Sequence, residues 1–241
     1  MNPYRESLYL TQADWHGYDS AETALAKHQT RAPYYAWFTK GWLPHDKSAT
    51  VLDLGCGSGQ FLWFLRERGY RNCSGVDLDA RQVELGRQLG LDCQAADILT
   101  ALHELKKRCD LIAVFDVLEH LRKDELHEVM TLISKRLEPG GGRLLLSVPN
   151  AESPSGPAVL YGDLTHEAAF TWGSICELCY CHGLTIKAFR DPFPAPVTSL
   201  RWVYRLVALT ARRIEAARLR VLGLSAPRFW SYNLWAYAEK Q

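Results

Sequence analysis

The chain has 241 residues, of which 47% are apolar and 23% charged, and its net charge of +1 gives no reason to expect nucleic acid as the main partner. This length predicts one α/β domain with a small cap, and we find neither a signal-peptide apolar core near the start nor an apolar run long enough to span a membrane. Seven cysteines, an odd number, indicate free thiols in the cytoplasm.

The first 48 residues are rich in aromatic side chains. A helical pattern covers residues 20–40, as one helix or two, with Pro33 near a helix start. Two interpretations are open for this segment: a helical cover that packs aromatic rings on a sheet, or a lid over a ligand. On the second interpretation, the side chains that face the ligand are drawn from Tyr18, His28 and Tyr35.

A glycine-rich turn lies between two short strand patterns, at residues 51–54 and 73–76, and a helical pattern follows the turn. Glycines 55, 57 and 59 let the backbone approach a ligand, and the N–H groups at the start of a helix face that ligand. Asp77 ends the second strand, where a carboxylate can accept hydrogen bonds from both ribose hydroxyls. This arrangement predicts a nucleoside site.

The sixth position of the turn, Gln60, distinguishes between cofactors. A dinucleotide fingerprint has a third glycine there, so the pattern for NAD fails. The order Asp53-Leu54-Gly55-Cys56-Gly57-Ser58-Gly59 instead resembles motif I of the class I S-adenosylmethionine-dependent methyltransferases. The resemblance implies a Rossmann-like sheet of seven mostly parallel strands in the order 3-2-1-4-5-7-6, with the last strand antiparallel and helices on both sides.

The same resemblance implies S-adenosylmethionine as cofactor and S-adenosylhomocysteine as product. Asp97 and Ile98 follow a third strand at residues 93–96 and match the family's adenine contacts. Asp97 has an alternative role as the cap of a turn or helix, since Asp is a favoured cap. The full set of cofactor-binding residues implied by the resemblance is Asp53, Gly55, Cys56, Gly57, Gly59, Gln60, Asp77, Leu78, Asp97, Ile98 and Phe115.

Residues 109–116 read as a buried parallel strand, and the segment Phe115-Asp116-Val117-Leu118-Glu119-His120-Leu121 follows from its end. This segment resembles the family's D-x-x-E-H-L motif after strand four. By that resemblance, Phe115 lies along the cofactor, and Glu119 and His120 lie near its methyl group. His120 is a candidate general base, and the alternative is that it only holds the loop.

The segment after a fifth strand, residues 143–148, bears on the acceptor. The sequence Tyr161-Gly162-Asp163-Leu164-Thr165-His166-Glu167-Ala168-Ala169-Phe170-Thr171 resembles methyltransferases found with O-antigen and other polysaccharide assembly enzymes. The resemblance implies a sugar hydroxyl on a saccharide or lipid-linked glycan precursor as acceptor. Alternatives are a quinone or natural product as acceptor, or a silent cofactor-binding protein.

His166 is the second candidate base in this segment. A neutral imidazole near pH 7 suits removal of a proton from a hydroxyl under methyl attack. The competing interpretation is a polar network of Asp163, His166 and Glu167 that shapes the loop. The residues alone do not rank His166 against His120.

No metal site is expected in this chain, and the cysteine-rich segment is the candidate that we considered. The helix predicted at residues 171–182 carries Cys176, Cys179, Cys181 and His182, but no second ligand pair follows at a standard distance. We therefore interpret these cysteines as structural.

The tail carries a strand at residues 184–190, a long helix at 198–222 and a last strand at 229–238. In the helix, Leu200, Val203 and Val207 form an apolar stripe, while Arg201, Arg205 and Arg212 share another face. Such a helix suits the surface of an anionic membrane, with its arginine face toward the lipid head groups and residues 197–222 in contact with the membrane. The alternatives are a homodimer surface or a helix packed on the sheet.

These features predict one methyltransferase domain over residues 1–241, with four parts. A helical cap covers residues 1–48, and the S-adenosylmethionine-binding core covers 49–190. A basic amphipathic insertion follows at 191–228, and the final strand occupies 229–241. The expected location is the cytoplasm, with the inner face of the membrane as the site of action if the basic helix binds lipid.

Overall fold

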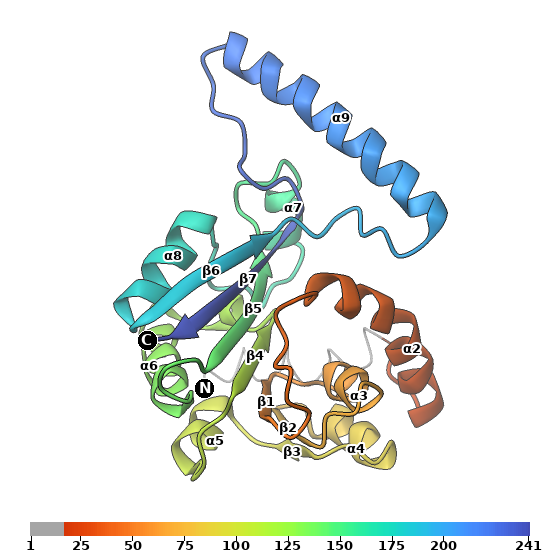
Figure 1. The fold of residues 1–241 in the computed structure, drawn as a ribbon, viewed down its shortest axis with the longest axis vertical. Helices are drawn as coiled ribbons and strands as arrows, with labels where there is room; N and C mark the ends of the chain where they lie inside the picture. Colours follow the sequence, from red (N-terminus) through yellow and green to blue (C-terminus); the bar gives the residue numbers. More distant parts are fainter. Residues whose placement is uncertain (1–16) are drawn as a thin grey trace.

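The computed structural model describes residues 17–241, and the first sixteen residues of the predicted cap lie outside this part. A seven-stranded sheet with the order β3-β2-β1-β4-β5-β7-β6 forms the centre of the domain (Figure 1). β7 is antiparallel to β5 and β6, and the other pairs are parallel, so the predicted fold is confirmed. The strands are β1 Thr50–Leu54, β2 Asn72–Asp77, β3 Cys93–Ala95, β4 Leu111–Phe115, β5 Arg143–Pro149, β6 Leu184–Arg190 and β7 Asn233–Lys240.

Helices cover both faces of the sheet. They are α2 Ala21–Phe38, α3 Gln60–Arg66, α4 Ala80–Gln88, α5 Ile98–Glu104, α6 Lys123–Arg136, α7 Gly156–Leu160, α8 Trp172–Cys181 and α9 Ser199–Val221, with a 3₁₀ turn at Leu118–His120. Successive side chains of β4 point to opposite faces: Ile112 packs in the core with α5, α6 and α8, whereas Leu111 packs among the aromatic residues of α2 and α3. Burial on both faces explains why β4 reads as a continuous apolar run.

Pro33 departs from the prediction. It lies inside the single helix α2 rather than near a helix start. A proline inside a helix cannot donate to the carbonyl four residues earlier, here that of Gln29. Both residues are exposed, so water can satisfy this carbonyl and the helix continues.

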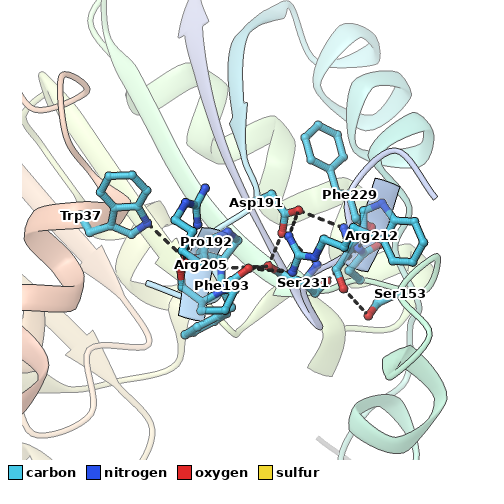
Figure 2. A network of polar contacts seen from close by, with 12 residues as sticks. Trp37, Ser153, Asp191, Pro192, Phe193, Arg205, Arg212, Phe229 and Ser231 are labelled. Carbon is cyan, nitrogen blue, oxygen red and sulfur yellow. Dashed lines mark hydrogen bonds and ion pairs between the residues drawn. The ribbon is translucent and has the colours of Figure 1, made fainter. Parts of the chain in front are cut away.

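β7 begins at Asn233, four residues later than the pattern predicts, because the preceding backbone bonds elsewhere. The N–H groups of Trp230 and Ser231 donate to the carboxylate of Asp191, at 3.1 and 2.8 Å (Figure 2). Asp191 also pairs with the guanidinium of Arg212, whose Nη1 lies 2.8 Å from Oδ2. This network joins the end of β6, the start of β7 and α9.

α9 stands away from the body of the domain (Figure 1) and buries none of its residues. The arginine face that we predicted to meet lipid points the other way. Arg205 donates to the carbonyl of Pro194 at 2.9 Å, Arg212 bonds Asp191 and the carbonyl of Phe193, and Arg201 lies over the ring of Tyr34. Arg205 and Arg212 thus bond backbone and carboxylate oxygens of the linker after β6, and the apolar stripe of α9 faces solvent instead.

Across residues 17–241, the structure contains no helix that combines the length and apolar character needed to cross a bilayer.

Candidate active site

A cavity of about 760 Å³ opens at the carboxyl ends of the central strands, where ligands bind in open α/β sheets. Its volume is in the range of pockets that hold small molecules. It is lined from five directions: the loop after β1, the ends of β2, β3 and β4, and one side of α2. Of the residues predicted to bind the cofactor, those that line it are Gly55, Gly57, Gln60, Asp77, Leu78, Asp97 and Ile98.

Two glycines let the loop after β1 reach the cavity. Gly55 and Gly57 have φ values of +76° and +53°, which side chains rarely tolerate. A Cβ on Gly55 would lie 2.3 Å from Cγ2 of Val117, and one on Gly57 would lie 2.9 Å from Oε1 of Gln82. The loop therefore presents bare backbone to the cavity, as a nucleoside cradle requires.

Asp77 fixes this loop to the end of β2. Its Oδ2 accepts from the N–H of Gly57 at 2.7 Å, and its Oδ1 accepts from the N–H of Asp79 at 2.8 Å. Burial raises the pKa of Asp77, while these two N–H groups act in the opposite direction. Asp77 therefore bonds the glycine loop with one carboxylate oxygen and the segment after β2 with the other, and it still lines the cavity.

Asp97 has the capping role that we considered as its alternative. Its Oδ1 accepts from the N–H groups of Leu99 and Thr100, at 2.9 and 3.3 Å, at the start of α5. Asp97 also lines the cavity beside Ile98, so the residue that caps α5 lies at the predicted site.

Four predicted residues lie outside the cavity wall. Asp53 is buried in β1, where burial raises its pKa well above the usual range. Cys56 is buried against Gly75, and a Cβ on Gly59 would lie 2.5 Å from Leu91, so both positions serve the packing of the loop. Phe115 packs in an aromatic cluster, with ring centroids 4.9 and 4.5 Å from those of Phe61 and Trp235.

α2 forms a wall of the cavity that the sequence did not predict in detail. The lining residues of α2 are Thr23, Ala26, Lys27, Thr30 and Arg31. Four of them are spaced i, i+3, i+4 and i+7, a small and polar stripe that helical periodicity could have revealed. The lid interpretation gains support from this stripe.

Of the three lid candidates, Tyr18 lines the cavity, and its hydroxyl accepts from Nε2 of Gln60 at 2.5 Å. His28 is buried and its Nε2 lies 3.0 Å from Oγ of Ser58 in the glycine loop. Tyr35 packs against Phe61 with ring centroids 5.4 Å apart. Thus His28 fastens α2 to the loop, and Tyr35 belongs to the core.

The two histidine candidates lie together, with ring centroids 4.8 Å apart. The hydroxyl of Thr165 donates to Oδ1 of Asp163 at 2.6 Å, so it accepts from Nδ1 of His120 at 2.8 Å. Nδ1 of His166 donates to the carbonyl of Leu160 at 3.0 Å. In the neutral rings, Nε2 is therefore the acceptor nitrogen of each histidine.

Glu119 holds the His166 loop beside the 3₁₀ turn. Its carbonyl accepts from the N–H groups of Glu167 and Ala168, at 2.7 and 3.0 Å. Its side chain is 1% exposed, and Oε2 has no hydrogen-bond partner in the described part of the chain. Burial, with a smaller effect of Asp116, raises the pKa of Glu119 well above its usual range.

His120 lines the cavity directly, and His166 lies behind it. The predicted polar network of the loop is present in a different form, because Asp163 bonds Thr165 and Glu167 is exposed. Asp116 and Val117 also line the cavity but were not predicted. Asp116 has a φ of +55° and accepts from Ser147 and Asn233, an arrangement that the local sequence does not signal.

The sheet order, the glycine loop and the carboxylate at the tip of β2 define a nucleoside-binding α/β protein. A family model for a methyltransferase domain matches residues 26–197. The chain belongs to this family, whose members use S-adenosylmethionine as cofactor.

Solved structures agree on the fold. An S-adenosylmethionine-dependent methyltransferase from Archaeoglobus fulgidus matches with a TM-score of 0.62 and 20% identity, over 96% of this chain and 99% of that one. Magnesium protoporphyrin IX methyltransferase of Synechocystis, solved with bound S-adenosylmethionine, matches with a TM-score of 0.53 and 17% identity, over 90% and 81% of the two chains.

Two curated relatives match shorter segments. Ribosomal protein L11 methyltransferase of Burkholderia thailandensis is 31% identical over 98 residues, which is 41% of this chain and 31% of the relative. The mitochondrial ubiquinone biosynthesis O-methyltransferase of Candida albicans is 32% identical over 112 residues, 43% of this chain and 34% of the relative. The chain thus spans about a third of the length of each relative.

The described residues fit S-adenosylmethionine. Gly55 and Gly57 line the cavity with backbone alone, and Asp77 lines it with a carboxylate that suits a ribose. Leu78 and Ile98 supply apolar surface for a base.

Proposed function

We propose that the chain transfers the methyl group of S-adenosylmethionine to a hydroxyl group of a saccharide or of a lipid-linked glycan precursor. The observation that carries this proposal is the pair of imidazoles beside the cofactor cradle, each with Nδ1 as the donor and Nε2 as the nitrogen that can accept a proton. Hydroxyl groups need such an acceptor because they are poor nucleophiles until the proton is being removed.

Each group of residues has a defined task in this proposal. The cofactor supplies an electrophilic methyl group. Gly55, Gly57 and Asp77 hold its nucleoside and amino acid portions, with Asp97 and Ile98 at the base. His120, oriented by Thr165, meets the acceptor at the cavity, and His166 lies close enough to share the proton.

The saccharide assignment is supported by the loop around His166. Its sequence resembles methyltransferases found with polysaccharide assembly enzymes, and Tyr161 and Leu164 at its surface are 85% and 76% exposed. Exposed aromatic and apolar groups beside a polar loop suit contact with sugar rings. The second candidate acceptor is a phenolic hydroxyl of a quinone precursor, favoured by the match to the ubiquinone O-methyltransferase.

The test is methyl transfer from radiolabelled S-adenosylmethionine to two panels, nucleotide-linked and lipid-linked saccharides and phenolic quinone precursors. Labelled saccharide supports the proposal, and label only in the phenols overturns the saccharide assignment. S-adenosylhomocysteine titration of the wild type and of Asp77→Ala tests the cofactor site separately. An unchanged affinity in Asp77→Ala would remove the ribose contact from the proposal.

We further propose that α9 binds the surface of an anionic membrane, which would bring the active site to a lipid-linked acceptor. Its outward stripe consists of exposed apolar side chains: Leu200, Val203, Tyr204, Val207, Ile214 and Val221 are between 53% and 87% exposed. Arg213, Arg218 and Arg220 are exposed on the same helix, and Arg218 pairs with Glu215, the one acidic residue of the helix. Two such helices would repel each other, whereas anionic head groups complement the charge.

Vesicle flotation tests this contact, with vesicles of neutral lipid alone and of neutral lipid mixed with phosphatidylglycerol. We expect the wild type to float with the anionic vesicles and Val207→Asp/Ile214→Asp to stay in solution. Tyr180→Asp, which changes an exposed aromatic residue on α8, should float like the wild type. A concentration-dependent dimer that the α9 variant abolishes, without flotation of the wild type, would instead identify the stripe as a homodimer surface.

A further inference from the structure

The cluster beside the cavity has the donor set of a metal site. Glu119, His120 and His166 each offer one ligand atom, and these atoms all lie within 4.8 Å of one another. Three protein ligands from two imidazoles and a carboxylate, with positions left open, are a donor set of catalytic zinc and of other divalent transition metals. We propose that this cluster binds one divalent transition-metal ion, with zinc as its representative.

The outer contacts of the two rings support this inference. A histidine that binds a metal through one nitrogen usually donates the other N–H to a carbonyl or carboxylate-linked group. Here Nδ1 of His166 bonds the carbonyl of Leu160, and Nδ1 of His120 bonds the hydroxyl of Thr165, which in turn bonds Asp163. Both Nε2 atoms are thereby set as the binding atoms.

Glu119 supplies the independent observation. Its carboxylate is buried, and Oε2 has no hydrogen-bond partner in the part of the chain that the structure describes. A buried, unpaired carboxylate oxygen is costly, and a cation removes that cost. The carbonyl of the same residue holds the backbone of residues 167 and 168, so Glu119 also keeps His166 within reach.

The geometry requires only a small adjustment. Two atoms bound to one zinc ion at about 2.1 Å each lie no more than about 4.2 Å apart. Side-chain rotations that move the ligand atoms by about 1 Å therefore bring all three to bonding distance. Imidazole ligands favour zinc and similar ions over magnesium, which prefers oxygen.

This inference rests on the proposed function for its chemical meaning and revises our expectation that the chain binds no metal. With the ion bound, both Nε2 lone pairs are occupied. An acceptor hydroxyl at an open position of the ion would then have a lowered pKa and would release its proton to solvent water, in place of proton transfer to a ring nitrogen. The open positions of the ion would face the cavity that His120 lines.

The test is zinc titration of the tag-free, chelator-treated chain by calorimetry, with magnesium titrated in parallel. We expect one zinc ion per chain, bound at least about 100-fold more weakly by Glu119→Gln and by His166→Ala, because a lost ligand costs at least as much as a lost outer contact. Thr165→Val should weaken binding about 10-fold to 100-fold.

A second histidine pair provides the matched control. The rings of His127 and His182 are 4.9 Å apart, but Nε2 of His182 bonds Nδ1 of His127, and no carboxylate among residues 17–241 completes a ligand group with them. His127→Ala and Cys176→Ser/Cys181→Ser should bind zinc like the wild type. Zinc binding that is lost in these controls, or that is equal in wild type and Glu119→Gln, would overturn the site.

S-adenosylhomocysteine titration of the same samples separates the two proposals. Wild-type protein that binds S-adenosylhomocysteine but no zinc overturns the metal site alone. Protein that binds zinc but not S-adenosylhomocysteine overturns the proposed function and leaves the metal site.

Discussion

The glycine loop after β1 and the histidine cluster after β4 lie at the same cavity, but backbone groups form the loop and side chains form the cluster. The loop is shaped by backbone: positive φ angles at Gly55 and Gly57, and the N–H group of Gly57 donating to Asp77. The histidine cluster is shaped by side chains, and His120 and Thr165 come from positions 45 residues apart. The loop is therefore local in sequence, whereas the cluster depends on how two loops meet.

The two regions also differ in what they do for stability. In the loop, a carboxylate that lines the cavity also stabilises the fold, because Asp77 is bonded on both oxygens. In the cluster, Glu119 keeps a buried oxygen that has no partner within residues 17–241. We infer that the loop is stable by itself, and that the cluster carries a cost that function offsets.

The largest effect is expected for Gly55→Ala. The substitution forces a side chain to φ +76° and places its Cβ 2.3 Å from Val117, so we expect a loss of about 2–5 kcal/mol in the free energy of unfolding. Urea unfolding measures this loss, and S-adenosylhomocysteine titration should show weakened binding. Gly69→Ala is the matched control, because Gly69 has φ +84° but a Cβ added there would meet no atom of residues 17–241 within 4 Å. Equal losses in the two variants would show that contact with Val117 is unimportant.

The free energy of unfolding should depend on pH through His28, which bonds Ser58 in the glycine loop. Burial, with a smaller effect of Arg66, lowers the pKa of His28 to about 4. Between pH 6.5 and about 4, His28 is protonated in the unfolded chain but neutral in the folded chain. The free energy of unfolding is therefore highest above pH 6.5 and decreases as the pH falls toward about 4. The full effect is about 3 kcal/mol.

His28→Gln should flatten this decrease while keeping a partner for Ser58. The measurement is urea unfolding from about pH 4.5 to 8, compared with His45→Gln, which changes an exposed histidine. A wild-type profile that His28→Gln leaves unchanged would show that the pKa of His28 is the same in the folded and unfolded chains.

In the histidine cluster, we expect a substitution that raises the free energy of unfolding, whereas Gly55→Ala in the loop lowers it. In chelator-treated protein, Glu119→Gln should raise the free energy of unfolding by about 1–3 kcal/mol, because it removes an unpaired buried carboxylate. Urea unfolding with Glu177→Gln as an exposed control measures the effect. A decrease in stability would mean that Glu119 stabilises the fold and that the two regions do not differ in this respect.

The sheet order was predicted through the resemblance to a known family, whereas the loop side of the cavity was predicted from short segments. The spacing of Gly55, Gly57 and Asp77 follows from one strand, one turn and the next strand, and each of these residues lines the cavity. The meeting of His120 with His166 depends on the carbonyl of Glu119 bonding residues 167 and 168, a long-range contact that no local pattern signals.

The direction of α9 shows the same limit. Periodicity separated the apolar stripe from the arginine face, and that separation is present in the structure. The arginine face points inward because Arg205 and Arg212 donate hydrogen bonds to oxygen atoms of the linker after β6. The acceptors are the carboxylate of Asp191 and the carbonyls of Phe193 and Pro194. Partners that lie in irregular linkers do not enter a helical pattern, so the assignment of faces required the structure.

The smallest effect is expected where the lid meets the loop. Tyr18→Phe removes the hydroxyl that accepts from Gln60 at 2.5 Å, and a single neutral hydrogen bond contributes about 1 kcal/mol. The affinity for S-adenosylhomocysteine should therefore fall about 5-fold, with Tyr180→Phe, on the exposed side of α8, unchanged. Because Tyr18 and Gln60 both line the cavity, this loss would assign the lid to the cofactor side of the site. If the affinity for S-adenosylhomocysteine is unchanged but the rate of methyl transfer changes, Tyr18 belongs to the acceptor side of the site. Only the step at the histidine cluster would then depend on Tyr18.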